Sequence, residues 1–338
     1  MKKHIPYLDG WRGLAIVCLL IGHFFPVDGI NLGTVGVTLF FVLSGLLMAQ
    51  VLFVQRIDFG TFYRRRMSRV FPSVVVYLAA ITLIFLLIGK TIAPKEFLSA
   101  LTFTNNYFVY KDWIMPFGHI WSLSVEEHSY ILLSLAAYWC RSRGGRPLLA
   151  VAALLSATLL AVAVYTLVPG TTAPSFHLRT EVASFGIFAS GFFALALVQK
   201  QVRLTQAWMA PAGIITGILA HWWSVPFPLR VIVGAGALAL AINAMPSAPR
   251  WLVAAFESNW LRRLGIYSFS LYLWQQPFYQ LCGRSELSPL LGLVFSLVTG
   301  WVAFHLIESP ARLYLNKRWA AKSGRGLVHQ DETSAVSS

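Results

Sequence analysis

Two ionisable residues, Arg12 and His23, lie in a stretch of sequence that is otherwise apolar. At about 100° per residue, a spacing of eleven brings the second side chain to within roughly 20° of the first, about 16 Å further along a helix. Histidine titrates near neutral pH, so His23 is a candidate general base. The structural alternatives are a histidine that hydrogen-bonds a neighbouring helix and an arginine that extends to the membrane surface.

A second group of polar residues surrounds the start of a later apolar stretch and includes His119, Glu126 and Glu127. Two adjacent carboxylates at the start of an apolar helix need partners, because burying an unpaired charge is costly. Arg179 and Glu181 begin a further apolar stretch at the same expected level. A simple ion pair is the alternative interpretation of these last two residues.

The cysteines indicate neither a disulfide framework nor a zinc site. Cys18, Cys140 and Cys282 lie in separate apolar stretches, and the chain has no CxxC spacing. No glycine-rich phosphate loop is present either. We therefore expect no metal site and no bound cofactor.

The composition predicts the elements that must hold these residues. The chain has 338 residues, of which 57% are hydrophobic and 12% charged, and its mean hydropathy is +0.65. Soluble proteins carry about 25% charged residues, and a helix of about 20 apolar residues crosses a bilayer. We predict an all-α, polytopic bundle of about ten transmembrane helices. The expected spans are Gly13–Ile30, Gly33–Gln55, Phe71–Ile88, Ser122–Cys140, Pro147–Val168, Glu181–Val198, Ala207–Trp223, Leu229–Met245, Tyr267–Cys282 and Pro289–Ile307.

The formal net charge of +14 is best explained by membrane topology, because the basic residues fall between the apolar stretches. With the N-terminus inside, 20 of the 27 lysines and arginines lie on the cytoplasmic side and 6 outside, with Arg12 at the inner edge. That distribution follows the positive-inside rule and predicts cytoplasmic termini. Nucleic acid is not an expected partner. We expect a transmembrane domain over residues 1–315 and a disordered basic cytoplasmic tail over 316–338.

Five sequence blocks, in the same order, resemble the acyltransferase-3 family of integral membrane O-acyltransferases. The resemblance runs from Tyr7 to about Arg312. Gln275 departs from it, because the family often has histidine at this position. The blocks are YLDGWRGLA (7–15) followed by His23, GVTLFFVLSG (36–45), RRRMSRVFP (64–72), WSLSVE (121–126) and YSFSLYLW (267–274).

The resemblance implies that a cytoplasmic acyl-CoA, most often acetyl-CoA, donates to a hydroxyl of an extracytoplasmic or lipid-linked carbohydrate. It also makes Glu126, rather than Glu127, the carboxylate that matches the family. Guanidinium groups suit phosphates, so the expected donor-binding residues are Arg64, Arg65, Arg66 and Arg69.

The expected catalytic residues are His23, Arg12 and Glu126. His23 would act as the base or as the site of a covalent acyl-histidine, and Glu126 would orient an imidazole. The expected location is the bacterial inner membrane, with membrane lipid as a further partner. The expected residues for the acceptor or for charge stabilisation are Asp9, His119, Trp121, Ser122, Arg179 and Glu181.

Two other function classes stay open from the sequence. Buried charges could line the path of a transporter for a lipid-linked saccharide, because membrane character serves either function. A non-catalytic subunit of an envelope-assembly complex is the second alternative. The sequence indicates neither the acceptor nor the oligomeric state.

Overall fold

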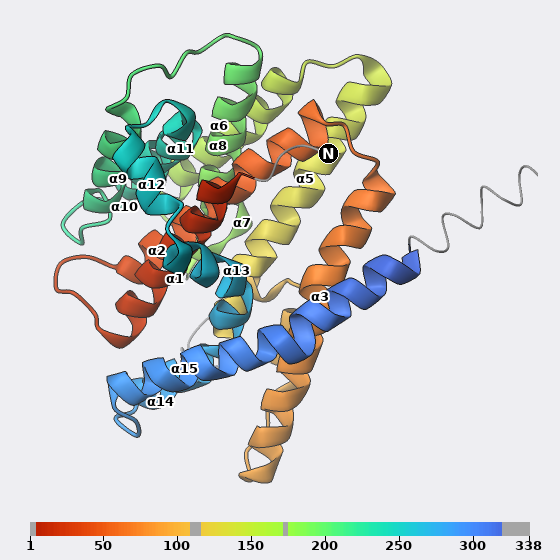
Figure 1. The fold of residues 1–338 in the computed structure, drawn as a ribbon, viewed down its shortest axis with the longest axis vertical. Coiled ribbons are helices and arrows are strands. Elements are labelled where there is room, and N and C mark those ends of the chain that lie inside the picture. Colours follow the sequence, from red (N-terminus) through yellow and green to blue (C-terminus); the bar gives the residue numbers. More distant parts are fainter. Residues whose placement is uncertain (1–4, 109–115, 172–174, 320–338) are drawn as a thin grey trace, which may run out of the picture.

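The computed structural model describes residues 5–108, 116–171 and 175–319, and every element within those ranges is helical. The all-α prediction is therefore confirmed. Figure 1 shows long helices arranged as a bundle. The main helices are α1 (Pro6–Phe24), α2 (Leu32–Met48) with η1 (Ala49–Val54), α3 (Phe59–Leu87), α5 (Trp121–Arg143), α6 (Pro147–Leu167), α7 (Thr180–Ala183), α8 (Phe185–Val198), α9 (Met209–Leu219), α10 (Phe227–Leu229) with η5 (Arg230–Ala235) and α11 (Gly236–Ala244), α13 (Asn259–Trp274), α14 (Gln276–Gly283), and α15 (Pro289–Ala303) with η7 (Phe304–Glu308).

Short helices occupy the connections between these elements. They are α4 (Pro94–Leu101), η2 (Asn105–Tyr107), η3 (Gly118–Ile120), η4 (Phe176–Leu178), η6 (Met245–Ser247) and α12 (Arg250–Phe256). In Figure 1 the connections that follow η1, α5 and α8 lie at one end of the bundle, and those that follow α1, α3 and α14 lie at the other. This alternation is the arrangement that repeated membrane crossings require.

Six helices of the described residues are long and apolar enough to cross a membrane, so the structure supports a multi-pass membrane protein. The expected count of ten is higher. Helix α9 has 11 residues and α13 has 16, and α5 carries Glu126, Glu127, Arg141 and Arg143. The six are Leu32–Val54, Phe59–Leu87, Pro147–Leu167, Thr180–Val198, Phe227–Ser247 and Pro289–Trp319.

Two helix boundaries differ from the sequence prediction in a way that matters for the site. Helix α1 begins at Pro6 and ends at Phe24, several residues before the expected span, because proline is preorganised for the first helical position. Helix α3 begins at Phe59 rather than near Phe71. The side chain of Asp58 caps it by accepting a hydrogen bond from the Thr61 amide at 2.8 Å. The arginine run is therefore helical, not a loop.

The last helix also extends further than expected. It continues through η7 to Trp319, past residue 316 where we placed the start of the tail. Ser68 on α3 donates a hydrogen bond to the side chain of Asn316 at 3.1 Å, which fixes this extension against the bundle. Residues 320–338 of the expected tail lie outside the described residues.

Helix α1 lies between α2 and α13 and packs closely against both. The indole of Trp11, fully buried, donates to the Leu39 carbonyl of α2 at 3.1 Å. On the other side, a Cβ added to Gly265 of α13 would lie 1.8 Å from the backbone oxygen of Asp9. Small residues permit such approaches between membrane helices, and this one sets the position of the Asp9 and Arg12 turn.

The Gly265→Ala variant is expected to lose about 3 kcal/mol or more of stability, because the new methyl group overlaps a backbone atom that cannot move aside. The measurement is the Tm of the purified protein in detergent. Gly236→Ala is the matched control, since no atom lies within 4 Å of its added Cβ. Equal Tm values for the two variants would contradict the close contact between α1 and α13.

Candidate active site

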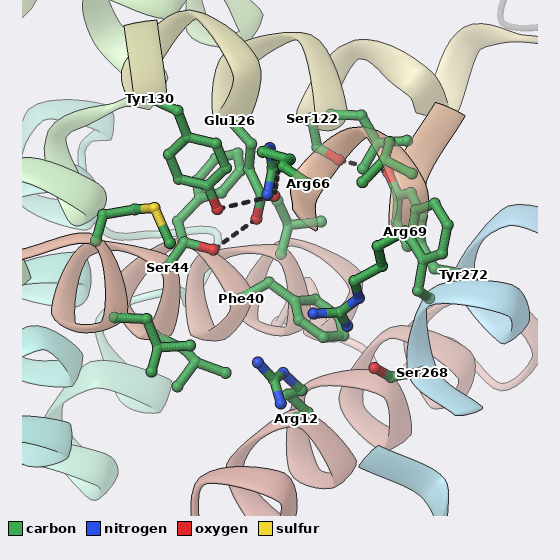
Figure 2. A pocket seen from close by; sticks show the side chains of 18 residues that line it. Arg12, Phe40, Ser44, Arg66, Arg69, Ser122, Glu126, Tyr130, Ser268 and Tyr272 are labelled. Atoms are coloured by element: carbon green, nitrogen blue, oxygen red, sulfur yellow. Dashed lines mark hydrogen bonds and ion pairs between the residues drawn. The ribbon is translucent and has the colours of Figure 1, made fainter. Parts of the chain in front are cut away.

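A central pocket of about 120 Å³ lies between α1, α2, α3, α5 and α13. Each of these helices contributes at least one polar side chain to it, and residues of α2 supply most of the apolar wall. Figure 2 shows several of these side chains directed into one space. The charged lining residues are Arg12, Arg66, Arg69 and Glu126.

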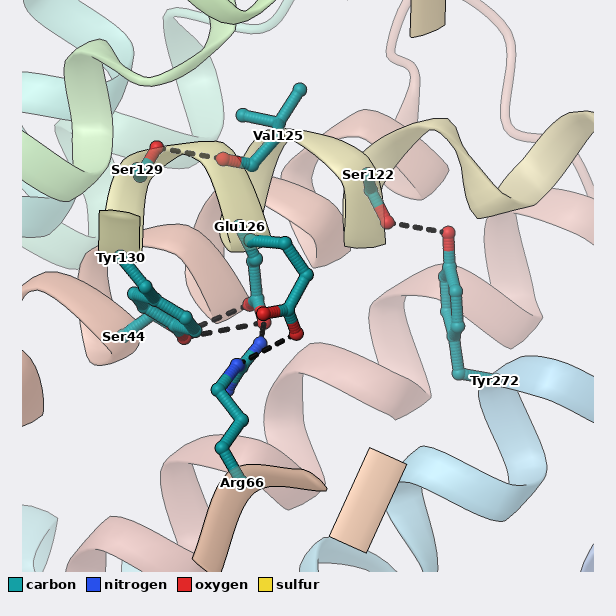
Figure 3. A network of polar contacts seen from close by, with 9 residues as sticks. Ser44, Arg66, Ser122, Val125, Glu126, Ser129, Tyr130 and Tyr272 are labelled. Atoms are coloured by element: carbon teal, nitrogen blue, oxygen red, sulfur yellow. Dashed lines mark hydrogen bonds and ion pairs between the residues drawn. The ribbon is translucent and has the colours of Figure 1, made fainter. Parts of the chain in front are cut away.

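Glu126 is held by three neighbours on one side of this pocket (Figure 3). Its Oε1 accepts a hydrogen bond from Ser44 at 2.8 Å. Its Oε2 accepts from Arg66 Nη2 and from the Tyr130 hydroxyl, both at 3.2 Å. Both oxygens of the carboxylate thus have partners, and among the described residues none of these partners is an imidazole.

Arg66 is the centre of that network. Its Nε donates to Glu127 at 2.7 Å while its Nη2 pairs with Glu126. Its guanidinium carbon also lies 3.7 Å from the centre of the Tyr130 ring, which adds a cation–π contact. One arginine therefore pairs with both adjacent glutamates and is the partner that the sequence analysis expected these carboxylates to need.

The four arginines expected to bind the donor separate into two pairs. Arg66 and Arg69, three residues apart on one face of α3, line the pocket. Arg64 and Arg65 are exposed and do not line it. Within the described residues, Arg69 makes no hydrogen bond or ion pair, so its guanidinium is available to an anion.

Arg12 joins Arg69 at this pocket. Its Nη1 pairs with Asp9 on the preceding turn of α1 at 3.1 Å, and Figure 2 shows the guanidinium groups of Arg12 and Arg69 directed into the same space. Arg12 is already paired with Asp9, so Arg69 is the guanidinium that remains for an anionic ligand, with Arg12 beside it. This is the arrangement that a phosphate group would stabilise.

The start of α5 contributes a second polar chain. The hydroxyls of Ser122 and Tyr272 lie 2.7 Å apart, and Tyr272 also donates to the His119 carbonyl. The ring of His119 is buried between Tyr77 and Tyr272 and does not line the pocket. Trp121 contacts the edge of Phe41. Of these expected residues, only Ser122 faces the pocket.

His23 lies near the opposite end of α1 from Arg12 and outside the central pocket. Its Nδ1 is 2.9 Å from the Oε1 atom of Gln275. Its ring stacks on Tyr279, with ring centres 4.1 Å apart and planes inclined by 17°. The structure therefore gives the imidazole a different orienting partner from the one expected, Glu126.

Arg179 and Glu181 belong to a separate cluster at the start of α7. Glu181 accepts hydrogen bonds from Tyr107 at 2.8 Å and from Tyr165 at 2.9 Å. Arg179 donates to the Tyr165 hydroxyl at 3.0 Å and lies 4.0 Å from Glu181. Neither residue lines the central pocket. Their side chains bind each other and two tyrosines, as the ion-pair alternative describes.

Similarity to a known protein family covers most of the chain. A family described as "Acyltransferase domain" matches residues 5–307. The chain belongs to the acyltransferase-3 family. The family prediction made from the five sequence blocks is thereby confirmed, and the helices that carry those blocks, α1, α2, α3, α5 and α13, all line the pocket.

Named relatives within this family include two bacterial O-acetyltransferases. The chain is 25% identical over 360 residues to "Peptidoglycan O-acetyltransferase OatA" of Listeria monocytogenes, covering 92% of the chain and 56% of that protein. It is 26% identical over 352 residues to "O-acetyltransferase OatA" of Staphylococcus aureus, covering 92% and 57%. The chain thus spans a little over half the length of these relatives. No solved structure matches it.

Several residues that hold the site together were not predicted from the sequence. Ser44 and Tyr130 fix Glu126, and Gln275 and Tyr279 fix His23. Ser44 lies in one of the motif blocks, and its place on the face of α2 that also presents Phe40 could have indicated it. Nothing local in the sequence pairs Gln275 with a residue 252 positions earlier.

Arg69→Ala is expected to weaken the binding of a phosphate-bearing ligand in this pocket by about 10- to 100-fold, since a hydrogen bond to a charged group contributes about 1.5–3 kcal/mol. The Tm without ligand should change little, because the substitution removes repulsion from Arg12 and attraction to Glu308 together. Titration of the purified protein in detergent with CoA, used as a phosphate-bearing probe, measures this effect. Arg64→Ala, an exposed arginine of the same run, is the control. An equal loss of affinity in both variants would show that only bulk charge matters.

Proposed function

We propose that this protein is a membrane O-acyltransferase that moves an acyl group, acetyl in the first instance, from acyl-CoA to a carbohydrate hydroxyl. The observation that carries the proposal is that the two ends of α1 present different chemical groups. One end presents Arg12 beside Arg69, whose guanidinium makes no hydrogen bond or ion pair among the described residues, and the other end presents His23. An anion-binding pocket and a titratable imidazole are thus joined by one helix.

In this proposal the donor binds from the cytoplasm of a bacterium, and both termini lie on that side of the inner membrane. Arg69 and Arg12 bind phosphate groups of the donor, since guanidinium groups form paired hydrogen bonds with phosphate oxygens. The chain itself holds no cofactor in this scheme. The Glu126 and Arg66 network keeps the pocket wall in place.

His23 accepts the proton of the acceptor hydroxyl as the hydroxyl oxygen attacks the thioester carbon. The carbon–sulfur bond then breaks, and the CoA thiolate takes up a proton. In the alternative order, His23 itself first carries the acyl group and then passes it to the hydroxyl. Both orders consume one acyl-CoA and release one CoA thiol for each ester formed.

The acceptor class is an extracytoplasmic or lipid-linked carbohydrate. The Listeria relative is named a peptidoglycan O-acetyltransferase, which makes peptidoglycan the first acceptor to test. The cluster of Tyr107, Tyr165, Arg179 and Glu181 offers aromatic and charged groups of the kind that bind sugars. Trp121 packs against Phe41, and His119 packs against Tyr77 and Tyr272.

Release of CoA thiol by the purified full chain in proteoliposomes tests the proposal. With acetyl-CoA inside and soluble peptidoglycan fragments outside, free thiol and acetylated fragments should appear in equal amounts. A transporter would move its saccharide without consuming acetyl-CoA, and a non-catalytic subunit would show neither change. Absence of thiol release with every carbohydrate acceptor offered would reject the enzyme.

A further inference from the structure

The contact between His23 and Gln275 determines which nitrogen of the imidazole carries the proton. Gln275 is completely buried, and its Nε2 faces two acceptors, the Tyr272 carbonyl at 3.4 Å and Gln276 Oε1 at 3.3 Å. Those acceptors require the NH₂ group on their side, so the carboxamide oxygen faces His23. A carbonyl oxygen only accepts hydrogen bonds, and therefore Nδ1 of His23 carries the hydrogen.

The opposite edge of the His23 ring, which carries Nε2, remains available to accept a proton. With Nδ1 protonated, a neutral imidazole has its lone pair on Nε2. That atom would lie 3.3 Å from a Cβ added to Gly33, the second residue of α2. Because Gly33 has no side chain, the space beside Nε2 stays open, and the stack with Tyr279 keeps the ring from turning away.

We propose that Gln275 is a positioning residue that holds His23 as the Nδ1–H tautomer and aims its Nε2 at the acceptor hydroxyl. This inference rests on the proposed function, in which His23 is the base or acyl carrier. Two titratable side chains near the ring, His119 on η3 and Tyr279 on α14, make no hydrogen bond to it in the described part of the chain. Gln275 is therefore the group that sets its tautomer.

Chemical labelling of the full-length protein tests the inference without relying on turnover. Diethyl pyrocarbonate reacts with unprotonated imidazole nitrogen, and mass spectrometry of the His23 peptide measures the rate at each pH. In Gln275→Glu a carboxylate replaces the amide oxygen and favours the imidazolium. The pH at which His23 is half-reactive should then rise by about 1–2 units. In Gly33→Ala labelling should slow, because the methyl group stands against Nε2.

Acyl transfer provides the second measurement. Gln275→Leu removes the acceptor for Nδ1–H and should lower kcat about tenfold or more, with an unchanged KM for acetyl-CoA. In Gln275→Glu the acidic side of the pH–rate profile should move in the same direction as the labelling midpoint. Thr38→Val is the matched control, since Thr38 contacts a different buried histidine, His221, at 3.2 Å. This control should leave kcat and the labelling of His23 unchanged.

The outcomes separate the inference from the proposed function. An unmoved labelling midpoint in Gln275→Glu, or wild-type kcat in Gln275→Leu, would overturn the role of Gln275 even if the protein transfers acyl groups. A protein that transfers no acyl group but shows the shifted midpoint would overturn the proposed function and retain the tautomer assignment. A shifted midpoint together with a reduced kcat supports both.

Discussion

Replacing His23 by glutamine is expected to lower kcat for acyl transfer by about 100- to 10,000-fold, the range over which a general base contributes. Glutamine keeps a polar side chain beside Gln275 but cannot take up a proton at neutral pH. The measurement is steady-state transfer from radiolabelled acetyl-CoA to a carbohydrate acceptor over a range of donor concentrations. The KM for the donor should stay unchanged, because His23 does not line the pocket that holds Arg12 and Arg69.

His221→Gln provides the control for this experiment. His221 is also buried and also hydrogen-bonded, through Thr38 and the Gly217 carbonyl, but it does not line the central pocket. This control variant should retain most of the wild-type rate. If His23→Gln transferred acetyl groups at the rate of His221→Gln, His23 would be a packing histidine, which is the structural alternative that its sequence position left open.

Replacing Arg66 by methionine is expected to destabilise the protein by about 3–5 kcal/mol, the usual cost of removing one partner from a buried ion pair. Arg66 is the shared partner of Glu126 and Glu127, and the side chains of all three are at most 20% exposed. Its loss leaves two adjacent carboxylates without a cation in the described structure around them. Thermal unfolding in detergent, followed by the loss of monodisperse protein, measures the change.

A triple variant tests separately how the network of Arg66, Glu126 and Glu127 contributes to stability and to activity. Arg66→Met combined with Glu126→Gln and Glu127→Gln removes every charge of the network at once, and a neutral network of similar volume should recover most of the lost stability. Acyl transfer should stay low, because Arg66 and Glu126 no longer hold the pocket wall in place. Full recovery of activity would indicate that the network serves only the fold.

The fold was largely predictable from hydropathy, but the helix boundaries near the site were not. Apolar stretches of about 20 residues predicted α6 within one residue at its C-terminal end. They could not predict where α3 begins, because its first three turns carry Arg64, Arg65, Arg66 and Arg69 and its start is capped by Asp58. The same limit explains α1, whose polar first turns are buried against α13.

The residues of the candidate site that lie in the motif blocks were predictable from the sequence. The contacts between residues far apart in the sequence were not. The blocks brought Arg12, Arg66, Arg69, Ser122 and Glu126 into one list, and the structure brings these five to one pocket. The blocks could not separate Arg64 and Arg65 from the other two arginines, because that distinction needs the helical phase of α3. The pairing of His23 with Gln275 required the three-dimensional packing of α1 against α13 and α14.

The close packing of α1 against α13 restricts how α1 can move during turnover. Backbone atoms of α13 approach Gly13 and those of Asp9 approach Gly265, so a sliding or tilting of α1 would force main-chain atoms together. Helix α1 is therefore expected to keep its position, and the distance between Arg12 and His23 stays constant. Any travel between the two ends must then be made by the small molecules themselves. On this view the helices keep their positions during turnover and the flexible reactants move between them. A transporter works differently, because its helices change position.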